Sequence, residues 1–147
     1  MKEIGFQGKK YPLNWDIYAH DRILQTAAEK GFTTIGDWME KAENEAYGII
    51  LYELICGGIR RHNFEVSMGF KGGRRIKMPD LQSDERQNIL SCVRAADMVQ
   101  IKAAVSMCWN EARRAEVPEE LKKYMPDDDY LEIAAEIEKN NPESEKN

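Results

Sequence analysis

Several common patterns are missing from this sequence. Its 147 residues include three cysteines and two histidines, with no Cys-x-x-Cys or clustered Cys/His spacing, so neither a disulfide framework nor a zinc site is indicated. No apolar stretch reaches the about 20 residues that cross a bilayer, and no apolar leader follows Met1. We therefore expect one cytoplasmic domain that takes no metal and no cofactor.

Catalytic patterns are missing as well. His20 falls on an apolar helix face, where a core histidine is the plain interpretation, and His62 closes a helix whose C-terminal dipole favours a cation. The glycine-rich stretch 69–73 lacks the Lys-Ser/Thr ending of a phosphate-binding loop. We expect a protein that is not an enzyme. Free cysteines are usually buried packing residues, and we expect this of Cys56, Cys92 and Cys108.

One strongly apolar helix dominates what is present. Residues Glu45–His62 carry apolar side chains around most of the helix, and only Glu53 interrupts the central run. Such a helix belongs at the centre of a bundle, and Asn44 is its predicted cap. Gly57 and Gly58 each cost about 1 kcal/mol relative to Ala inside a helix. They predict either a close approach of neighbouring backbone or fraying where the chain leaves the core.

Shorter elements surround this helix. The alternating residues of Glu3–Gln7 and the extended Tyr11–Leu13 predict a β-hairpin turning at Gly8-Lys9-Lys10. Asn14 or Asp16 can cap a first helix that runs to Lys30. The predicted fold class is mainly α, a helical bundle with a small N-terminal β-hairpin and a long basic loop. The predicted buried side of the first helix consists of Ile17, His20, Leu24, Ala27 and Ala28.

Two more helical regions complete the predicted domain, residues 1–115. Thr33 or Thr34 opens a short helix through residues 37–40, and Ser83 or Asp84 opens a longer one that is broken near residues 94–97. The clearest amphipathic stripe of the chain follows this break and ends around Ala115. It consists of Met98, Ile101, Val105, Cys108 and Ala112, at spacings of three and four.

Charge is distributed unevenly. The chain has a net charge of -5, but residues 60–77 carry six Lys/Arg against one Glu. Periodicity is lost over residues 66–80, which predicts a mobile basic loop with a flap-like strand pair around Gly72-Gly73. The loop can bind an acidic protein partner or nucleic acid, or can simply be solvated. Phosphate contacts alone would make nucleic-acid binding weak and salt-sensitive. The candidate partner-binding residues here are Arg60, Arg61, Lys71, Arg74, Arg75 and Lys77.

The C-terminal part is acidic. Residues 116–147 carry eleven Asp/Glu against four Lys, and they predict a helical extension over 116–139 and a disordered tail over 140–147. The last helix, Asp127–Glu138, begins with three aspartates at its positive end. Its apolar face either folds back onto the core or docks in the groove of a partner. This second group of candidate partner-binding residues consists of Tyr130, Ile133, Ala134 and Ile137.

Three segments carry a family resemblance. The first strand is followed by a Gly-Lys-x-Tyr-Pro-Leu segment at Gly8–Leu13, Asp37-Trp38 lies in the short helix, and the apolar helix ends in Gly58–Asn63. In these segments, and in the order of elements over Ile4–Arg114, the chain resembles the tail assembly chaperones of long-tailed bacteriophages and prophages. The loop 66–79 departs from the compact connection expected in that family.

The resemblance implies a non-enzymatic protein that binds the tape measure protein and recruits tail tube subunits, with a homo-oligomer left open. The alternative is a small helical regulatory or nucleic-acid-binding protein that uses the basic residues of 60–77. The surplus of amphipathic surface and the absence of catalytic patterns agree with the first of these.

Overall fold

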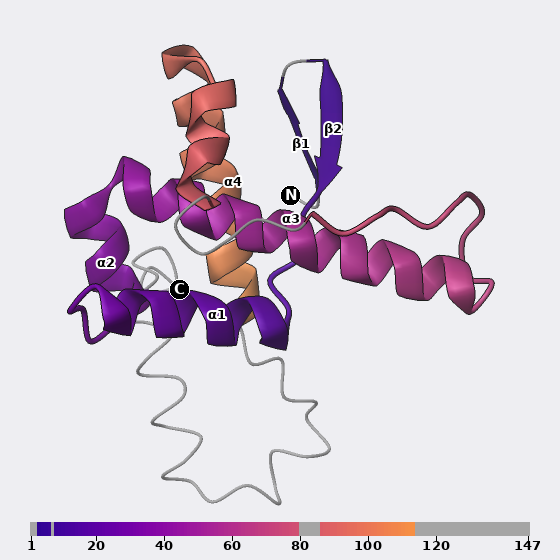
Figure 1. Ribbon diagram of the computed structural model, residues 1–147, viewed down its shortest axis with the longest axis horizontal. Helices are drawn as coiled ribbons and strands as arrows, with labels where there is room; N and C mark the ends of the chain where they lie inside the picture. The colour runs from indigo at the N-terminus through magenta and orange to yellow at the C-terminus, as the bar shows by residue number, and fades with distance from the viewer. Residues whose placement is uncertain (1–2, 7, 80–85, 114–147) are drawn as a thin grey trace, which may run out of the picture. The chain divides into compact units, whose positions relative to one another are not determined.

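The chain is mainly helical, with one small N-terminal hairpin, in a computed structural model that describes residues 3–6, 8–79 and 86–113 (Figure 1). This confirms the predicted fold class. The chain divides into two units, Met1–Cys108 and Trp109–Asn147, and the second is described only as far as Arg113. The predicted boundary near residue 115, the extension 116–139 and the tail 140–147 lie outside the described residues, as do Tyr130, Ile133, Ala134 and Ile137.

Helix α3, Asn44–Ser67, is the element on which the first unit is built. Every residue from Gly48 to Ile59 is buried, because neighbours contact this helix on several sides. These neighbours are the helices α1 (Ile17–Glu29) and α2 (Ile35–Ala42), the second hairpin strand and the 3-10 helix η1 (Arg86–Cys92). The prediction of a central core helix is confirmed.

Both predicted ends of the central helix are wrong. At its start, Glu43 holds a backbone φ of 43° and no side chain caps the helix, so Asn44 is its first residue and not its cap. At its end, the helix continues past His62 to Ser67. Its last turns carry few apolar side chains, and periodicity alone therefore ended the prediction too early.

The hairpin differs from its prediction in the turn. Strand β1 (Glu3–Phe6) pairs antiparallel with β2 (Lys9–Pro12), and Ile4 lies opposite Tyr11. Two residues placed in the turn by the sequence, Lys9 and Lys10, belong to β2, and Gly8, the described residue of the turn, has a left-handed backbone with φ at 73°. Ile4 and Phe6 are buried, which holds one face of the hairpin against the core.

The paired glycines of α3 are explained by the backbone that crosses them. A Cβ atom on Gly57 would lie 2.1 Å from the carbonyl oxygen of Asn14, and one on Gly58 would lie 2.3 Å from the carbonyl group of Pro12. At the same crossing, the backbone N–H of Asn14 donates to the carbonyl of Leu54 at 3.0 Å. Close approach, not fraying, is therefore the reason for the two glycines.

Helix α1 has the predicted ends but not the predicted face. Asp16 caps it by accepting from the N–H of Ala19 at 2.8 Å, and Gly31 follows it with φ at 89°. Ala27 is buried as expected and His20 is half-buried. Ile17 and Leu24, expected inside, are 66% and 42% exposed, and Ala28 is exposed too. The buried residues are Ala19, Ile23, Thr26 and Ala27, whose mostly small side chains permit close packing on α3. A search for large apolar residues overlooks such a face.

The remaining elements are α2, which precedes α3, and three described helices that follow the loop after α3. Thr34 caps α2 as predicted. The helix expected from residue 83 or 84 is instead η1, a 3-10 helix, and residues 83–84 lie outside the described part. The predicted break is confirmed, because a second 3-10 helix, η2 (Ala95–Asp97), separates η1 from α4 (Met98–Arg113). None of the described helices is both long and apolar enough to cross a membrane.

Helix α4 buries part of its predicted stripe. Ile101, Val105 and Cys108 are buried as expected, whereas Ala112 is exposed. Cys56 is buried too, but Cys92 at the end of η1 is exposed, so the expectation that all three thiols are packed is wrong for one of them.

Candidate partner-binding surface

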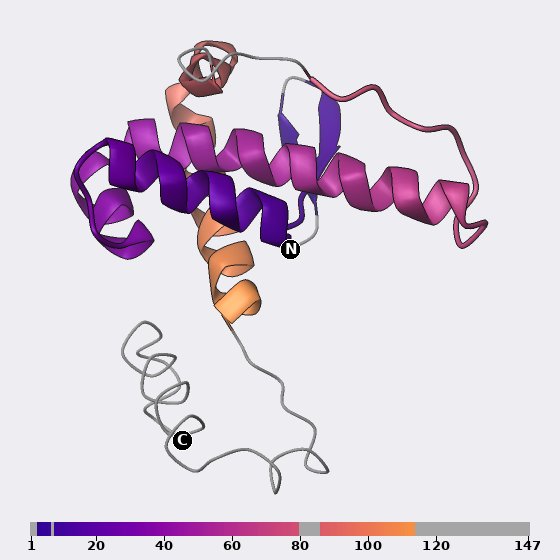
Figure 2. The same ribbon diagram turned by 60° about the horizontal axis from the view of Figure 1, so that its bottom comes forward.

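The end of α3 beyond Arg60, together with the loop 68–79, forms a surface that we call the tip. Arg60 is tied to Asp16 at the start of α1, and residues 61–67 continue the helix for roughly 10 Å beyond that point. Figures 1 and 2 both show this end of α3 extending past the first turn of α1, with the loop turning back from it. The tip is therefore a projection of the first unit.

The loop of the tip is held to α3 by hydrogen bonds. The side chain of Asn63 accepts from the N–H of Ile76 at 2.7 Å and donates to its carbonyl at 2.9 Å. His62 Nε2 lies 2.7 Å from the carbonyl oxygen of Arg74, and the Tyr52 hydroxyl donates to Pro79 at 3.3 Å. The predicted flap-like strand pair is wrong, since residues 68–79 contain no strand, and the loop that was expected to be mobile is anchored at three points.

Five of the six predicted basic residues are exposed on the tip. Within the part of the chain that the structure describes, only one of them has an acidic partner, the pair Arg61–Glu65 at 2.9 Å. A row of uncompensated cations on one loop favours a negatively charged partner. The exposed basic residues are Arg61, Lys71, Arg74, Arg75 and Lys77.

Arg60, the sixth predicted residue, is not available to a partner. Its guanidinium donates two hydrogen bonds of 2.8 Å to the carboxylate of Asp16 and lies 5.5 Å from the ring centroid of Tyr18. Burial raises the pKa of Asp16, but the hydrogen bonds from Arg60 and from the N–H of Ala19 outweigh it, so the pKa lies below its ordinary value. Arg60 therefore fastens α1 to α3.

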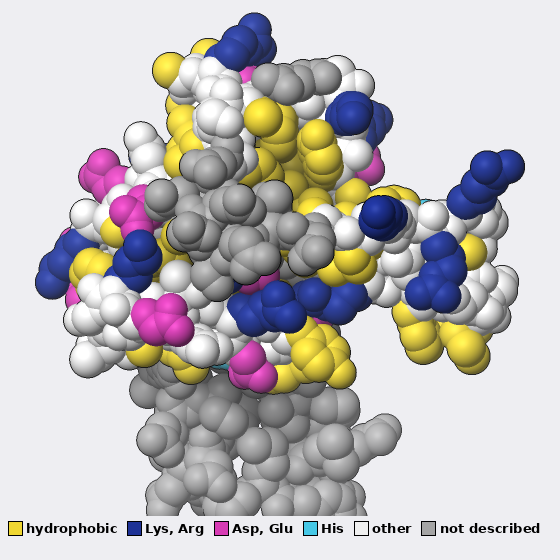
Figure 3. All heavy atoms as spheres, viewed as in Figure 1, with side chains coloured by type: hydrophobic (Ala, Val, Ile, Leu, Met, Phe, Trp, Pro, Cys, Tyr) yellow, Lys and Arg dark blue, Asp and Glu magenta, His cyan; other side chains and the backbone are white. Residues whose placement is uncertain are grey.

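An apolar cluster on the tip was missed by the sequence analysis. Phe64 and Phe70 are 58% and 71% exposed, Met68 is also exposed, and the two rings pack edge to face with centroids 6.2 Å apart. Figure 3 shows hydrophobic side chains beside Lys and Arg at this end of α3. Exposed aromatic residues next to arginine are typical of the centres of protein interfaces. The sequence indicated it through Phe64, Met68 and Phe70, but the assignment of residues 66–80 to a basic loop drew attention to the charged residues alone.

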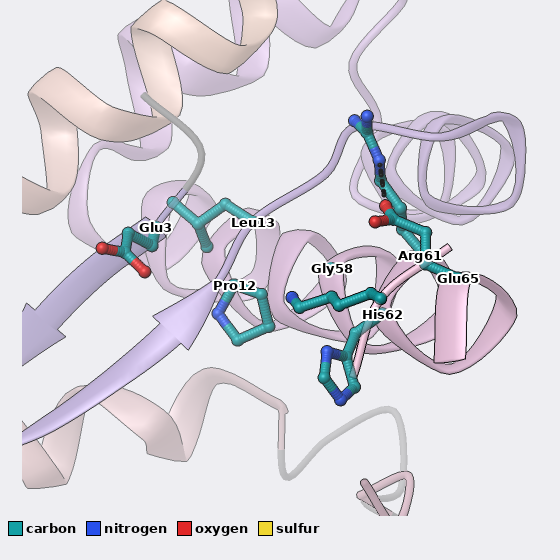
Figure 4. Close-up of a pocket in the computed structure, with 8 residues that line it drawn as sticks. Glu3, Pro12, Leu13, Gly58, Arg61, His62 and Glu65 are labelled. Carbon is teal, nitrogen blue, oxygen red and sulfur yellow. Dashed lines mark hydrogen bonds and ion pairs between the residues drawn. The ribbon is translucent and has the colours of Figure 1, made fainter. Parts of the chain in front are cut away.

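A pocket of about 280 Å³ lies where the hairpin meets the tip (Figure 4). Its floor is formed where β2 crosses α3, and its rim carries side chains of both charges, among them the Arg61–Glu65 pair. Such a pocket is large enough for one or two side chains of a partner. It is lined by Glu3, Pro12, Leu13, Gly58, Arg61, His62, Glu65 and Lys71.

A buried polar network is formed by residues that do not belong to this surface. Glu53, at 0% exposure, accepts from Arg86 at 2.8 Å, and Arg86 also donates to the hydroxyl of Thr26 at 3.0 Å. This network joins α3, α1 and η1 inside the core, so it positions η1 and is closed to a substrate. Among the described residues there is also no cluster of three or more side chains that could hold a metal ion.

Comparison with known proteins adds no relative to this description. No protein-family model, curated protein or solved structure matches the chain.

Proposed function

We propose that this protein is a tail assembly chaperone of a long-tailed bacteriophage or prophage, acting in the host cytoplasm by binding the tape measure protein and recruiting tail tube subunits. The observation that carries the proposal is the tip. Its exposed Phe64–Phe70 pair shares the tip with exposed cations, which suits a protein that holds a polypeptide partner.

The location of the resembling segments supports the proposal. The Gly-Lys-x-Tyr-Pro-Leu segment and the segment Gly58–Asn63 are far apart in the sequence, yet Pro12 packs against Gly58, and both segments line the pocket beside the tip. The residues of these two segments thus form one region, whereas the third segment, Asp37-Trp38, belongs to α2. A common region of this kind suits a shared partner better than scattered matches would.

Co-expression with the tape measure protein of the same phage or prophage tests the proposal. We expect the wild-type chain to co-purify with it, and the double substitution Phe64→Ala/Phe70→Ala to reduce recovery of the complex about tenfold or more. Val99→Ala is the matched control, because Val99 is 77% exposed but belongs to α4 and not to the tip. The proposal fails if the wild-type chain does not bind, and the role of the tip fails if both variants bind equally.

Nucleic-acid binding is the second candidate, favoured by the exposed side chains of Lys71, Arg74, Arg75 and Lys77 on one loop. We expect only weak binding of a random DNA duplex, lost between about 50 and 200 mM salt. Fluorescence anisotropy across that range measures it. A complex that is specific for one sequence and persists near physiological salt would favour the regulatory interpretation instead.

A further inference from the structure

The chemistry of the tip defines the chemistry of what can cover it. Two exposed aromatic rings and exposed Met68 form an apolar patch on the tip, and five exposed cations share this tip with them. The matching surface needs apolar anchor side chains flanked by carboxylates and free of basic residues. An amphipathic acidic segment fulfils this, since it can bury its apolar side on the rings and pair its acidic side with the exposed cations.

The chain itself contains one such segment. Residues 127–138, DDDYLEIAAEIE, include six acidic residues and no basic one. Four of the segment's six apolar residues recur at helical spacing, so one face of the predicted helix would carry these four. A helix of about three turns is marginal alone, which means that this face needs a surface to cover it. The four residues are Tyr130, Ile133, Ala134 and Ile137.

We propose that the tip binds the acidic segment 127–138 of a second copy of this protein. The tip projects beyond the contacts that Arg60 makes with α1, which makes it accessible to another molecule. Each copy contributes one tip and one acidic segment, so the two halves of the contact are different surfaces. Copies then join head to tail, or two copies exchange their segments. The inference is independent of the proposed chaperone function.

Charge reversal on each side of the contact tests this with full-length chains. The tip variant is Arg74→Glu/Arg75→Glu, and the segment variant is Asp127→Lys/Asp128→Lys. By sedimentation velocity at about 50 mM salt, we expect the wild type to self-associate and each variant alone to do so at least about tenfold more weakly. An equimolar mixture should recover association, because the wild-type segment of one variant meets the wild-type tip of the other.

Self-association of the wild type separates contact between copies from contact within one chain. If each acidic segment bound its own tip, the wild type would stay monomeric, whereas a mixture of the two variants that fails to recover association would overturn the proposal directly. A wild type that stays monomeric up to about 0.5 mM, or variants that associate as the wild type does, would overturn it too. The matched controls reverse the same number of charges elsewhere and should leave association unchanged. They are Lys9→Glu/Lys10→Glu on the hairpin and Glu143→Lys/Glu145→Lys beyond the segment.

The apolar half of the contact has its own test. Phe64→Ala/Phe70→Ala should weaken self-association about tenfold at about 50 mM and at about 500 mM salt alike, because burial of aromatic surface is not screened. The charge variants should differ from the wild type much less at the higher salt concentration. Equal association of the Phe variant and the wild type would remove the aromatic pair from the contact. A negative result for self-association does not bear on tape measure binding, and a failure to bind the tape measure protein does not bear on self-association.

Discussion

Substituting alanine for the glycines of the helices should raise the free energy of unfolding at some positions and lower it at others, and the structure predicts which change occurs at each. Gly58→Ala gains about 1 kcal/mol of helix propensity. Its new Cβ, however, would lie 2.3 Å from the carbonyl carbon and oxygen of Pro12, where ordinary contacts begin at 3.4 Å. The overlap of about 1 Å is with backbone, so the strand β2 has to move away from α3.

The expected net effect follows from two opposing terms. Overpacking costs about 1–3 kcal/mol, and displacing β2 also weakens the hydrogen bond from Asn14 to Leu54, worth about 1 kcal/mol. After subtraction of the propensity gain, Gly58→Ala should lower the free energy of unfolding by about 2 kcal/mol. For a chain of this length that corresponds to a fall in Tm of about 4–8 °C.

Two further glycines serve as matched controls. A Cβ atom on Gly36 in α2 would meet none of the described neighbours within 4 Å, so Gly36→Ala should raise the free energy of unfolding by about 0.5 kcal/mol. A Cβ atom on Gly48 would lie 2.7 Å from the side chain of Leu90, and a side chain can rotate away, so Gly48→Ala should fall between the two. Thermal unfolding followed by circular dichroism ranks the three. If Gly58→Ala is as stable as Gly36→Ala, the close crossing of β2 over α3 is refuted.

Three other predictions concern single contacts. The pKa of Asp16 is lowered from 3.8 in the folded state, so its pairing with Arg60 stabilises the fold above about pH 4, and this stability is lost as the pH falls through the folded pKa. Asp16→Asn should therefore flatten the acidic part of a curve of unfolding free energy against pH. Arg86→Met should destabilise the fold by about 3–5 kcal/mol in urea titrations, because it leaves the buried carboxylate of Glu53 unpaired; a loss below about 1 kcal/mol contradicts this. Cys92 should react with a maleimide in the native state while the other two thiols do not, as counted by mass spectrometry, and Cys92→Ser should abolish native labelling.

Sequence reasoning identified only part of the candidate surface. The density of Lys and Arg in residues 60–77 marked the region, and five of these side chains are indeed exposed on the tip. The role of Arg60 depended on Asp16, which lies 44 residues away and reaches it only when α1 packs on α3. The aromatic pair was missed because Phe64 and Phe70 meet only when the chain reverses direction at the end of α3.

Local pattern by itself determined the helical class, the hairpin and the central helix, and it narrowed the caps of α1 and α2 to two candidates each, because periodicity and capping act over a few residues. It also indicated that the glycines of α3 needed a reason. Only the tertiary structure decided which face of α1 is buried and which cation faces Glu53. Those outcomes depend on distances between residues remote in the chain, and no local pattern encodes such distances.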